Sequence, residues 1–150
     1  MKSLRIPFTI CLLISSFNLA AKSDLYSKNG LFLEGYDPVS YLLENKAKKG
    51  LNQISHYHDN TTINFSSEQN KEEFIKNPTR FIPAYNGWCA YAMAATGSLV
   101  EINPKAFKIT KGRTYLFYKT FWANTLKKWN KKDESKQIES ANKNWIKLGN

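Results

Sequence analysis

An uncharged apolar run near the N-terminus most constrains this chain, because it decides how many residues remain to fold. The run covers residues 6–21, follows Lys2 and Arg5, and ends in two alanines. It matches the apolar region of a secretory signal peptide and falls short of the roughly 20 residues that a membrane-spanning helix needs. We therefore expect residues 1–23 to be a signal peptide, cleaved on export to the periplasm or the extracellular space. An uncleaved membrane anchor is the alternative.

The size and charge of the remaining chain limit its class and its partners. Cleavage after residue 23 of the 150 leaves 127 residues, which we expect to form one domain over residues 24–150. The net charge falls from +10 to +7, because the lost segment holds three basic residues and no acidic one. Basic charge of this size suits an anionic membrane surface. Nucleic acid is not expected as a partner of an exported protein.

Segments rich in β-branched and aromatic residues predict β-hairpins, and apolar spacing with capping residues predicts short helices. Ser66 with Gln69 has the pattern of a capping box, and Gly97 suits the end of a helix. The expected fold class is α+β, with a small antiparallel sheet or hairpins packed against short helices. The predicted strands are residues 54–57, 62–65, 106–109 and 114–118, with turns at 58–61 and 111–113, and the predicted helices are 39–43, 66–77, 88–95, 121–129 and 133–148.

Several segments occur in an order and at a spacing that resemble one protein family. They are residues 35–41, 65–70, 74–78, 85–92, 107–109, 116–118 and 141–145, together with Trp129. They resemble the small exported YHS-domain proteins of bacteria over residues 31–148. The resemblance implies a YHS/TRASH-like domain with a central cysteine and a helical C-terminal extension, and relatives of this domain in heavy-metal proteins are thought to bind metal. Asn86 and Asn142 stand where Gly and Asp are usual in the family.

Cys89 is the first candidate functional residue. Because Cys11 lies in the predicted signal peptide, Cys89 is the sole cysteine of the exported chain and has no partner for a disulfide. It lies near the start of the predicted helix over residues 88–95, where the helix dipole favours the reactive thiolate. Met93 follows four residues later on the same face of that helix. Thiolate and thioether are soft ligands that suit Cu(I).

The two histidines of the chain supply the other half of a predicted metal site. His56 and His58 are two residues apart near a predicted strand, so both imidazoles point to one face if His58 belongs to the strand and not to the turn. With Cys89 and Met93 they form a set of two nitrogen and two sulfur donors, which is typical of a copper site. We therefore expect the protein to bind a soft metal ion, copper first, through Cys89.

Two other classes of function stay open. In the first, the protein is a non-catalytic module that binds a small ligand or a protein partner, Cys89 is structural, and aromatic residues line a pocket above it. In the second, Cys89 with His56 or His58 forms the nucleophile of a redox or hydrolytic enzyme. The sequence has no phosphate loop, dinucleotide fingerprint or pair of catalytic carboxylates that would favour an enzyme. The aromatic residues expected at the pocket are Tyr36, Tyr57, Tyr85, Trp88 and Tyr91.

Overall fold

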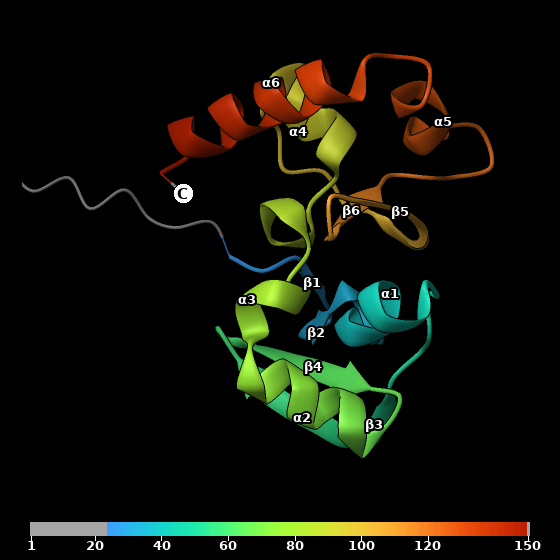
Figure 1. Ribbon diagram of the computed structural model, residues 1–150, viewed down its shortest axis with the longest axis vertical. Helices are drawn as coiled ribbons and strands as arrows, with labels where there is room; N and C mark the ends of the chain where they lie inside the picture. Colours follow the sequence, from blue (N-terminus) through green and yellow to red (C-terminus); the bar gives the residue numbers. More distant parts are fainter. Residues whose placement is uncertain (1–23, 150) are drawn as a thin grey trace, which may run out of the picture.

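The computed structural model describes residues 24–149, and these form an α+β fold, as expected (Figure 1). The strands are β1 (Ser27–Lys28), β2 (Leu31–Phe32), β3 (Leu51–His58), β4 (Thr61–Phe65), β5 (Asn103–Thr110) and β6 (Arg113–Phe117). The α-helices are α1 (Pro38–Glu44), α2 (Glu68–Lys76), α3 (Pro78–Phe81), α4 (Ala90–Thr96), α5 (Thr125–Trp129) and α6 (Glu134–Lys147), with two 3-10 helices, η1 (Leu33–Gly35) and η2 (Ala84–Gly87).

The elements form two parts along the long axis of the molecule. Four strands pair in the order β1-β2-β4-β3, and β5 pairs with β6 in a separate sheet. Figure 1 places the four-stranded sheet with α2 and α3 in the lower part, and α4, α5 and α6 in the upper part. The predicted signal peptide over residues 1–23 lies outside the described residues. No helix within residues 24–149 is long and apolar enough to cross a bilayer.

The hairpin of β3 and β4 turns in two residues. Asp59 and Asn60 have positive φ angles of 42° and 61°, which is the conformation of a tight turn whose twist matches that of its strands. The predicted turn over residues 58–61 is therefore too long, and His58 belongs to β3. The second predicted hairpin is present as β5 and β6. The four-stranded sheet also contains one parallel pairing, between β2 and β4.

The helix α2 begins one residue later than its capping pattern predicts. Ser67, not Ser66, is the N-cap, and its hydroxyl accepts a hydrogen bond from the Asn70 N–H at 3.2 Å. The Ser66 hydroxyl donates instead to the Asp37 carboxylate at 2.6 Å. Asp37 also caps α1, because its Oδ1 accepts from the Val39 N–H at 2.9 Å. One carboxylate therefore joins the starts of two helices.

The predicted helix over residues 121–129 is wrong in its first half. The helix α5 begins at Thr125, because the Asn124 side chain caps it there. Phe121 and Trp122 lie in the preceding loop and are 90% and 91% exposed. Their spacing matches that of an apolar helix face, but the cap sets the boundary and leaves both rings outside the core.

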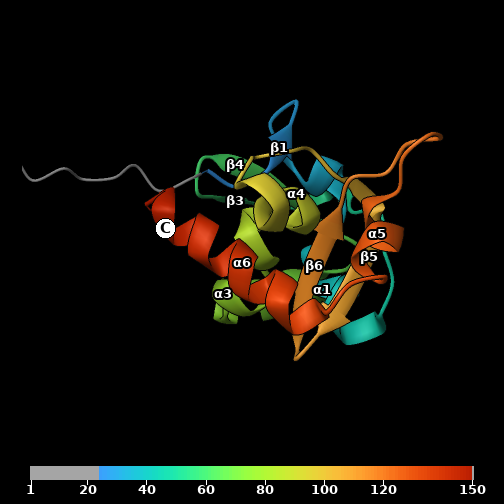
Figure 2. The same cartoon turned by 90° about the horizontal axis from the view of Figure 1, so that it is seen from above.

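Buried apolar side chains form two clusters that meet at α4. The first cluster lies among the four-stranded sheet, α1 and α2, and it includes Cys89. The second includes Met93 and joins α4 to β6, α5 and α6. Figure 2 shows α4 and α6 lying side by side. Since Cys89 immediately precedes α4 and Met93 lies within it, this one segment belongs to both clusters.

Candidate functional site

The chain reaches Cys89 through a turn of left-handed backbone. Tyr85, Asn86 and Gly87 of η2 have φ angles of 56°, 54° and 90°. This conformation costs about 1 kcal/mol or more for a residue that carries a side chain. A Cβ atom at Gly87 would lie 2.7 Å from Cδ2 of Leu33 in η1, so glycine alone fits there. Gly87 therefore packs directly against Leu33, two residues before Cys89.

Cys89 is completely buried, with an exposed fraction of 0%. It is the N-cap residue of α4, although its side chain makes no capping hydrogen bond. Its N–H donates to the Val100 carbonyl at 3.0 Å, and its own carbonyl accepts from the Met93 N–H at 3.0 Å. Gly97 ends the helix in the left-handed conformation, as predicted. Cys89 therefore lies at the helix start that the sequence predicts, but beneath the surface.

The Cys89 thiol belongs to a closed set of hydrogen bonds, which we call the thiol ring. Its Sγ accepts from the Tyr118 N–H at 3.3 Å and lies 3.6 Å from Oγ1 of Thr125. The Thr125 hydroxyl donates its one proton to the Tyr118 carbonyl at 2.8 Å, so toward sulfur it acts as an acceptor. The thiol therefore donates its own proton to Thr125. The thiol is thus hydrogen-bonded on both sides within the fold.

The thiol ring joins the two sides of the loop over residues 118–125, which we call the aromatic loop. Near its tip, the Thr120 N–H donates to the Ala123 carbonyl at 2.8 Å, and the Ala123 N–H donates to the Thr120 hydroxyl at 3.1 Å. This turn carries Phe121 and Trp122, whose ring centroids are 4.8 Å apart in an edge-to-face arrangement. In Figure 2 the segment between β6 and α5 projects from the right side of the molecule.

The structure brings the two histidines together. His56 and His58 lie on one face of β3, as their spacing predicts, with ring centroids 6.2 Å apart. Both rings pack against Phe74 of α2, at centroid distances of 6.4 Å and 5.4 Å. His58 Nε2 also lies 3.7 Å from the carboxylate of Asp59. The pair is therefore held by an aromatic contact at the outer side of the four-stranded sheet.

The four donors predicted for copper do not converge. Figure 1 shows β3, with His56 and His58, at the bottom of the molecule and α4 near the top. Cys89 is buried in the first cluster and Met93 in the second. Within residues 24–149, no three side chains of His, Cys, Asp or Glu are grouped so that they could hold a metal ion. The residues described here therefore do not fit a four-donor site, and metal binding by Cys89 stays a prediction.

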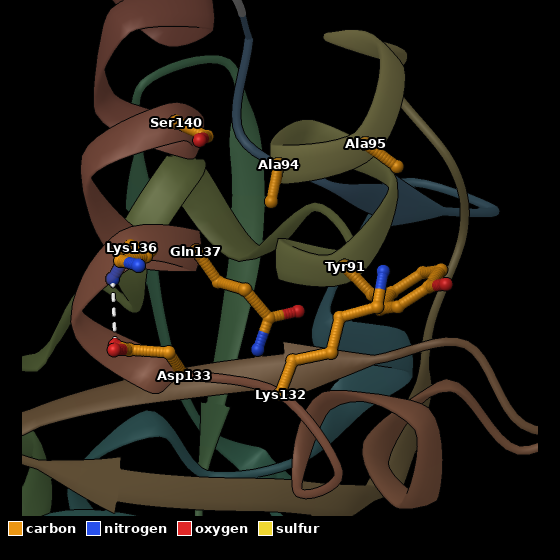
Figure 3. A pocket seen from close by; sticks show the side chains of 8 residues that line it. All are labelled: Tyr91, Ala94, Ala95, Lys132, Asp133, Lys136, Gln137 and Ser140. Atoms are coloured by element: carbon orange, nitrogen blue, oxygen red, sulfur yellow. Dashed lines mark hydrogen bonds between the residues drawn. The ribbon is translucent and has the colours of Figure 1, made fainter.

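A pocket of about 290 Å³ lies between α4 and α6 (Figure 3). The Lys132 ammonium lies 5.1 Å from the centre of the Tyr91 ring at its wall. Gln137 is 8% exposed and donates its amide N–H to the Trp129 carbonyl at 3.0 Å, which holds the α6 side of the wall in place. Besides two alanines of α4, the lining residues are Tyr91, Lys132, Asp133, Lys136, Gln137 and Ser140.

This pocket differs from the aromatic pocket that the sequence predicts. Tyr91 is the one predicted aromatic residue in its lining, and Cys89 does not line it. Tyr57 is 68% exposed on β3, and Tyr85 is buried, with its hydroxyl donating to Asn142 Oδ1 at 3.1 Å. Burial raises the pKa of Tyr85 well above its usual value, so this phenol stays neutral. The sequence does not point to this pocket, because Lys132 and Lys136 have the pattern of a solvent-exposed helix face.

Comparisons with family models, with curated proteins and with solved structures find no match to this chain. The resemblance to YHS-domain proteins therefore stays a prediction that rests on the segments of this sequence.

Proposed function

We propose that the protein is an exported, non-catalytic interaction module in which Cys89 is structural. The observation that carries this proposal is the thiol ring, in which Sγ accepts from Tyr118 and lies beside the Thr125 hydroxyl. A nucleophile has to reach its substrate, and a reactive thiol is usually a partly exposed thiolate. Cys89 has no exposed surface and its hydrogen-bonding capacity is filled, so it resembles a small buried side chain.

The aromatic loop is the binding element in this proposal. Phe121 and Trp122 are almost fully exposed, and large apolar side chains gathered on a surface mark interaction sites. The turn at the tip and the thiol ring at the base hold the loop before any partner arrives. A loop that is already ordered loses less conformational entropy on binding than a flexible one. The role of Cys89 is then to fix the base of this loop.

Copper binding through Cys89 and the structural role of Cys89 make opposite predictions for thiol reactivity. In full-length protein carrying Cys11→Ser, Cys89 is the sole thiol. We expect it to stay unmodified by Ellman's reagent in the folded state and to react fully after denaturation. Titration with Cu(I) should give equal binding for this protein and for the variant that also carries Cys89→Ala. Rapid thiol modification, or copper binding that is lost with Cys89→Ala, would overturn the structural role and support the copper site.

Removal of the thiol should also loosen the aromatic loop. We expect Cys89→Ala to lower the free energy of unfolding by about 2 kcal/mol, because a small cavity forms and the Tyr118 N–H loses its acceptor. The fluorescence anisotropy of Trp122 should fall, measured against a Trp122→Phe control that isolates its emission. Cys89→Ser keeps a donor and an acceptor at this position and should lose less stability. Unchanged Trp122 anisotropy in Cys89→Ala would show that the thiol does not hold the loop.

A further inference from the structure

We propose that the aromatic loop docks on an anionic lipid surface. The inference rests on the proposed function, which makes this loop the binding element, and it adds the chemistry of the partner. Three features support this inference: two exposed rings at a projecting tip, exposed lysines that flank the loop in the sequence, and the lack of acidic residues from position 102 to position 132.

The tip of the aromatic loop has the composition of a segment that enters a membrane interface. Phe121 and Trp122 are 90% and 91% exposed, and each ring has the other as its aromatic neighbour. Tryptophan prefers the boundary between headgroups and acyl chains, where its ring lies in an apolar layer and its N–H stays near water. A convex tip of two rings fits a deformable lipid surface, whereas a protein partner would need a matching cavity.

Lysines flank the aromatic loop in the sequence. Residues 102–132 contain eight lysines, one arginine and no acidic residue. Among the described residues, no ion pair involves the five exposed lysines nearest the loop in sequence. Asp133 and Glu134 follow directly, but Asp133 caps α6 and Glu134 pairs with Lys108. The five lysines are Lys119, Lys127, Lys128, Lys131 and Lys132.

These charges favour lipid headgroups over a neutral partner. An anionic leaflet attracts each nearby lysine by an amount that corresponds to about fivefold in affinity. The attraction of several lysines adds to the burial of two aromatic side chains, and such a pair of signals is what stable membrane binding requires. The same charges would attract nucleic acid. Proteins that bind single strands non-specifically, however, use a groove in which successive bases stack on aromatic side chains. The aromatic loop is a projecting tip and offers no such groove.

The inference is tested by binding of the full chain to vesicles of phosphatidylcholine and phosphatidylglycerol at about three to one. We expect the variant with Phe121→Ser and Trp122→Ser to bind at least about tenfold more weakly than the wild type. Tyr57→Ser, which removes an exposed ring from β3 at the other end of the molecule, is the control and should bind normally. Residues 1–23 are present in every variant, so a difference between two variants is assigned to the substituted residues.

A second readout reports the loop itself. Lipids brominated in the acyl chain should quench the emission of Trp122 on binding, and Trp122→Phe should lose this quenched component. The pair Lys127→Gln and Lys128→Gln should weaken binding by about fivefold per lysine, while Lys71→Gln with Lys76→Gln, an equal loss of charge on α2, should not. Vesicles of phosphatidylcholine alone have no anionic headgroups to attract the lysines, so the protein should bind them more weakly than the mixed vesicles.

Several outcomes would overturn the membrane inference. Equal binding by the Phe121→Ser, Trp122→Ser variant together with unquenched Trp122 would show that the loop stays in water. Single-stranded DNA that competes with the vesicles while Trp122 stays unquenched would assign the loop to nucleic acid. If either occurs while Cys89 remains unreactive, the lipid partner fails and the structural role of Cys89 stands. If Cys89 proves reactive while Trp122 is still quenched, the proposed function fails and the lipid contact stands.

Discussion

Asp37 is a buried carboxylate that organises the lower part of the molecule. Its Oδ1 accepts from the N–H groups of Val39 and Ser40, at 2.9 Å and 3.4 Å. Its Oδ2 accepts from the N–H and the hydroxyl of Ser66 and from the Asn70 amide, at 2.9 Å, 2.6 Å and 2.7 Å. Five donors thus take the place of water around a fully buried carboxyl group. The sequence predicts a helix over residues 39–43 but not the distant partners of Asp37.

Loss of this carboxylate should be costly. We expect Asp37→Ala to lower the free energy of unfolding by about 3 kcal/mol or more, because it leaves several buried donors without an acceptor. Asp37→Asn keeps one acceptor oxygen and should lose less. Urea denaturation followed by circular dichroism measures both values. A loss below about 1 kcal/mol for the alanine variant would mean that water replaces the carboxylate at this site.

Gly87 and Gly112 allow the steric cost of an added side chain to be measured apart from the cost of the backbone conformation. Both have positive φ, 90° and 71°, but an added Cβ would meet Leu33 at 2.7 Å in the first case and no atom within 4 Å in the second. We expect Gly112→Ala to cost about 1 kcal/mol through its φ alone. Gly87→Ala should cost at least about 1 kcal/mol more, because it also overpacks the core. Thermal unfolding of the two variants compares them, and equal losses would show that Leu33 moves aside freely.

At the scale of elements, Glu134 joins α6 to α5 and β5. Its carboxylate accepts from the Trp129 ring N–H at 2.9 Å and from the Thr110 hydroxyl at 3.1 Å, and it pairs with the Lys108 ammonium at 2.9 Å. Burial alone would raise the pKa of this carboxyl, but the hydrogen bonds from Trp129, Lys108 and Thr110 outweigh it, and the pKa is lowered. The folded state therefore favours the ionised form.

This lowered pKa predicts how stability depends on pH. A carboxyl that binds its proton more weakly in the folded state adds stability above its unfolded pKa, near 4.3, and loses it as the pH falls through the folded value. Glu134→Gln should therefore reduce the free energy of unfolding at neutral pH and flatten its decline below about pH 4. Glu72→Gln, an exposed carboxyl on α2, is the control. Parallel pH profiles for wild type and Glu134→Gln would contradict the assignment.

Local chemistry explains which elements the sequence predicts. Strand formation depends on β-branched and aromatic residues that alternate within each strand, and both predicted hairpins are confirmed. Gly97 ends α4, as expected. The start of α5 is missed because the Asn124 cap overrides an apolar spacing that continues back to Phe121. Local rules cannot show that the Ser66 hydroxyl is occupied by an acid 29 residues away. The start of α2 is therefore predicted one residue early.

The candidate site is less predictable than the elements, because distant residues build it. The sequence singles out Cys89 as the one thiol of the predicted mature chain. Its partners Tyr118 and Thr125 are 29 and 36 residues away and reach it only when β6 packs beside α4. Pairing of the histidines follows from their spacing on β3, whereas their separation from Met93 follows from the order of the elements in space.

At the scale of the whole molecule, α4 ties the two apolar clusters together. Cys89 packs in the first and Met93 in the second, so a change at one cluster moves the segment that borders the other. We expect both to unfold in one cooperative transition. Met93→Ala should cost about 2–5 kcal/mol. The loss in unfolding free energy that hydrogen exchange reports for β3 and β4 should equal the loss that Trp129 fluorescence reports in urea denaturation. A wild-type value for β3 and β4 would reveal two independent units.

The burial of Cys89 has a consequence for how copies of this chain associate. An unpaired thiol at a protein surface can form a disulfide with a second copy when the surroundings are oxidising, and the two chains are then joined covalently. Because Sγ of Cys89 is buried and hydrogen-bonded to Tyr118, it cannot form a disulfide with a second copy of the folded chain. Any dimer that forms through the described surface is then held by weak forces, dissociates on dilution and is unaffected by reducing agents.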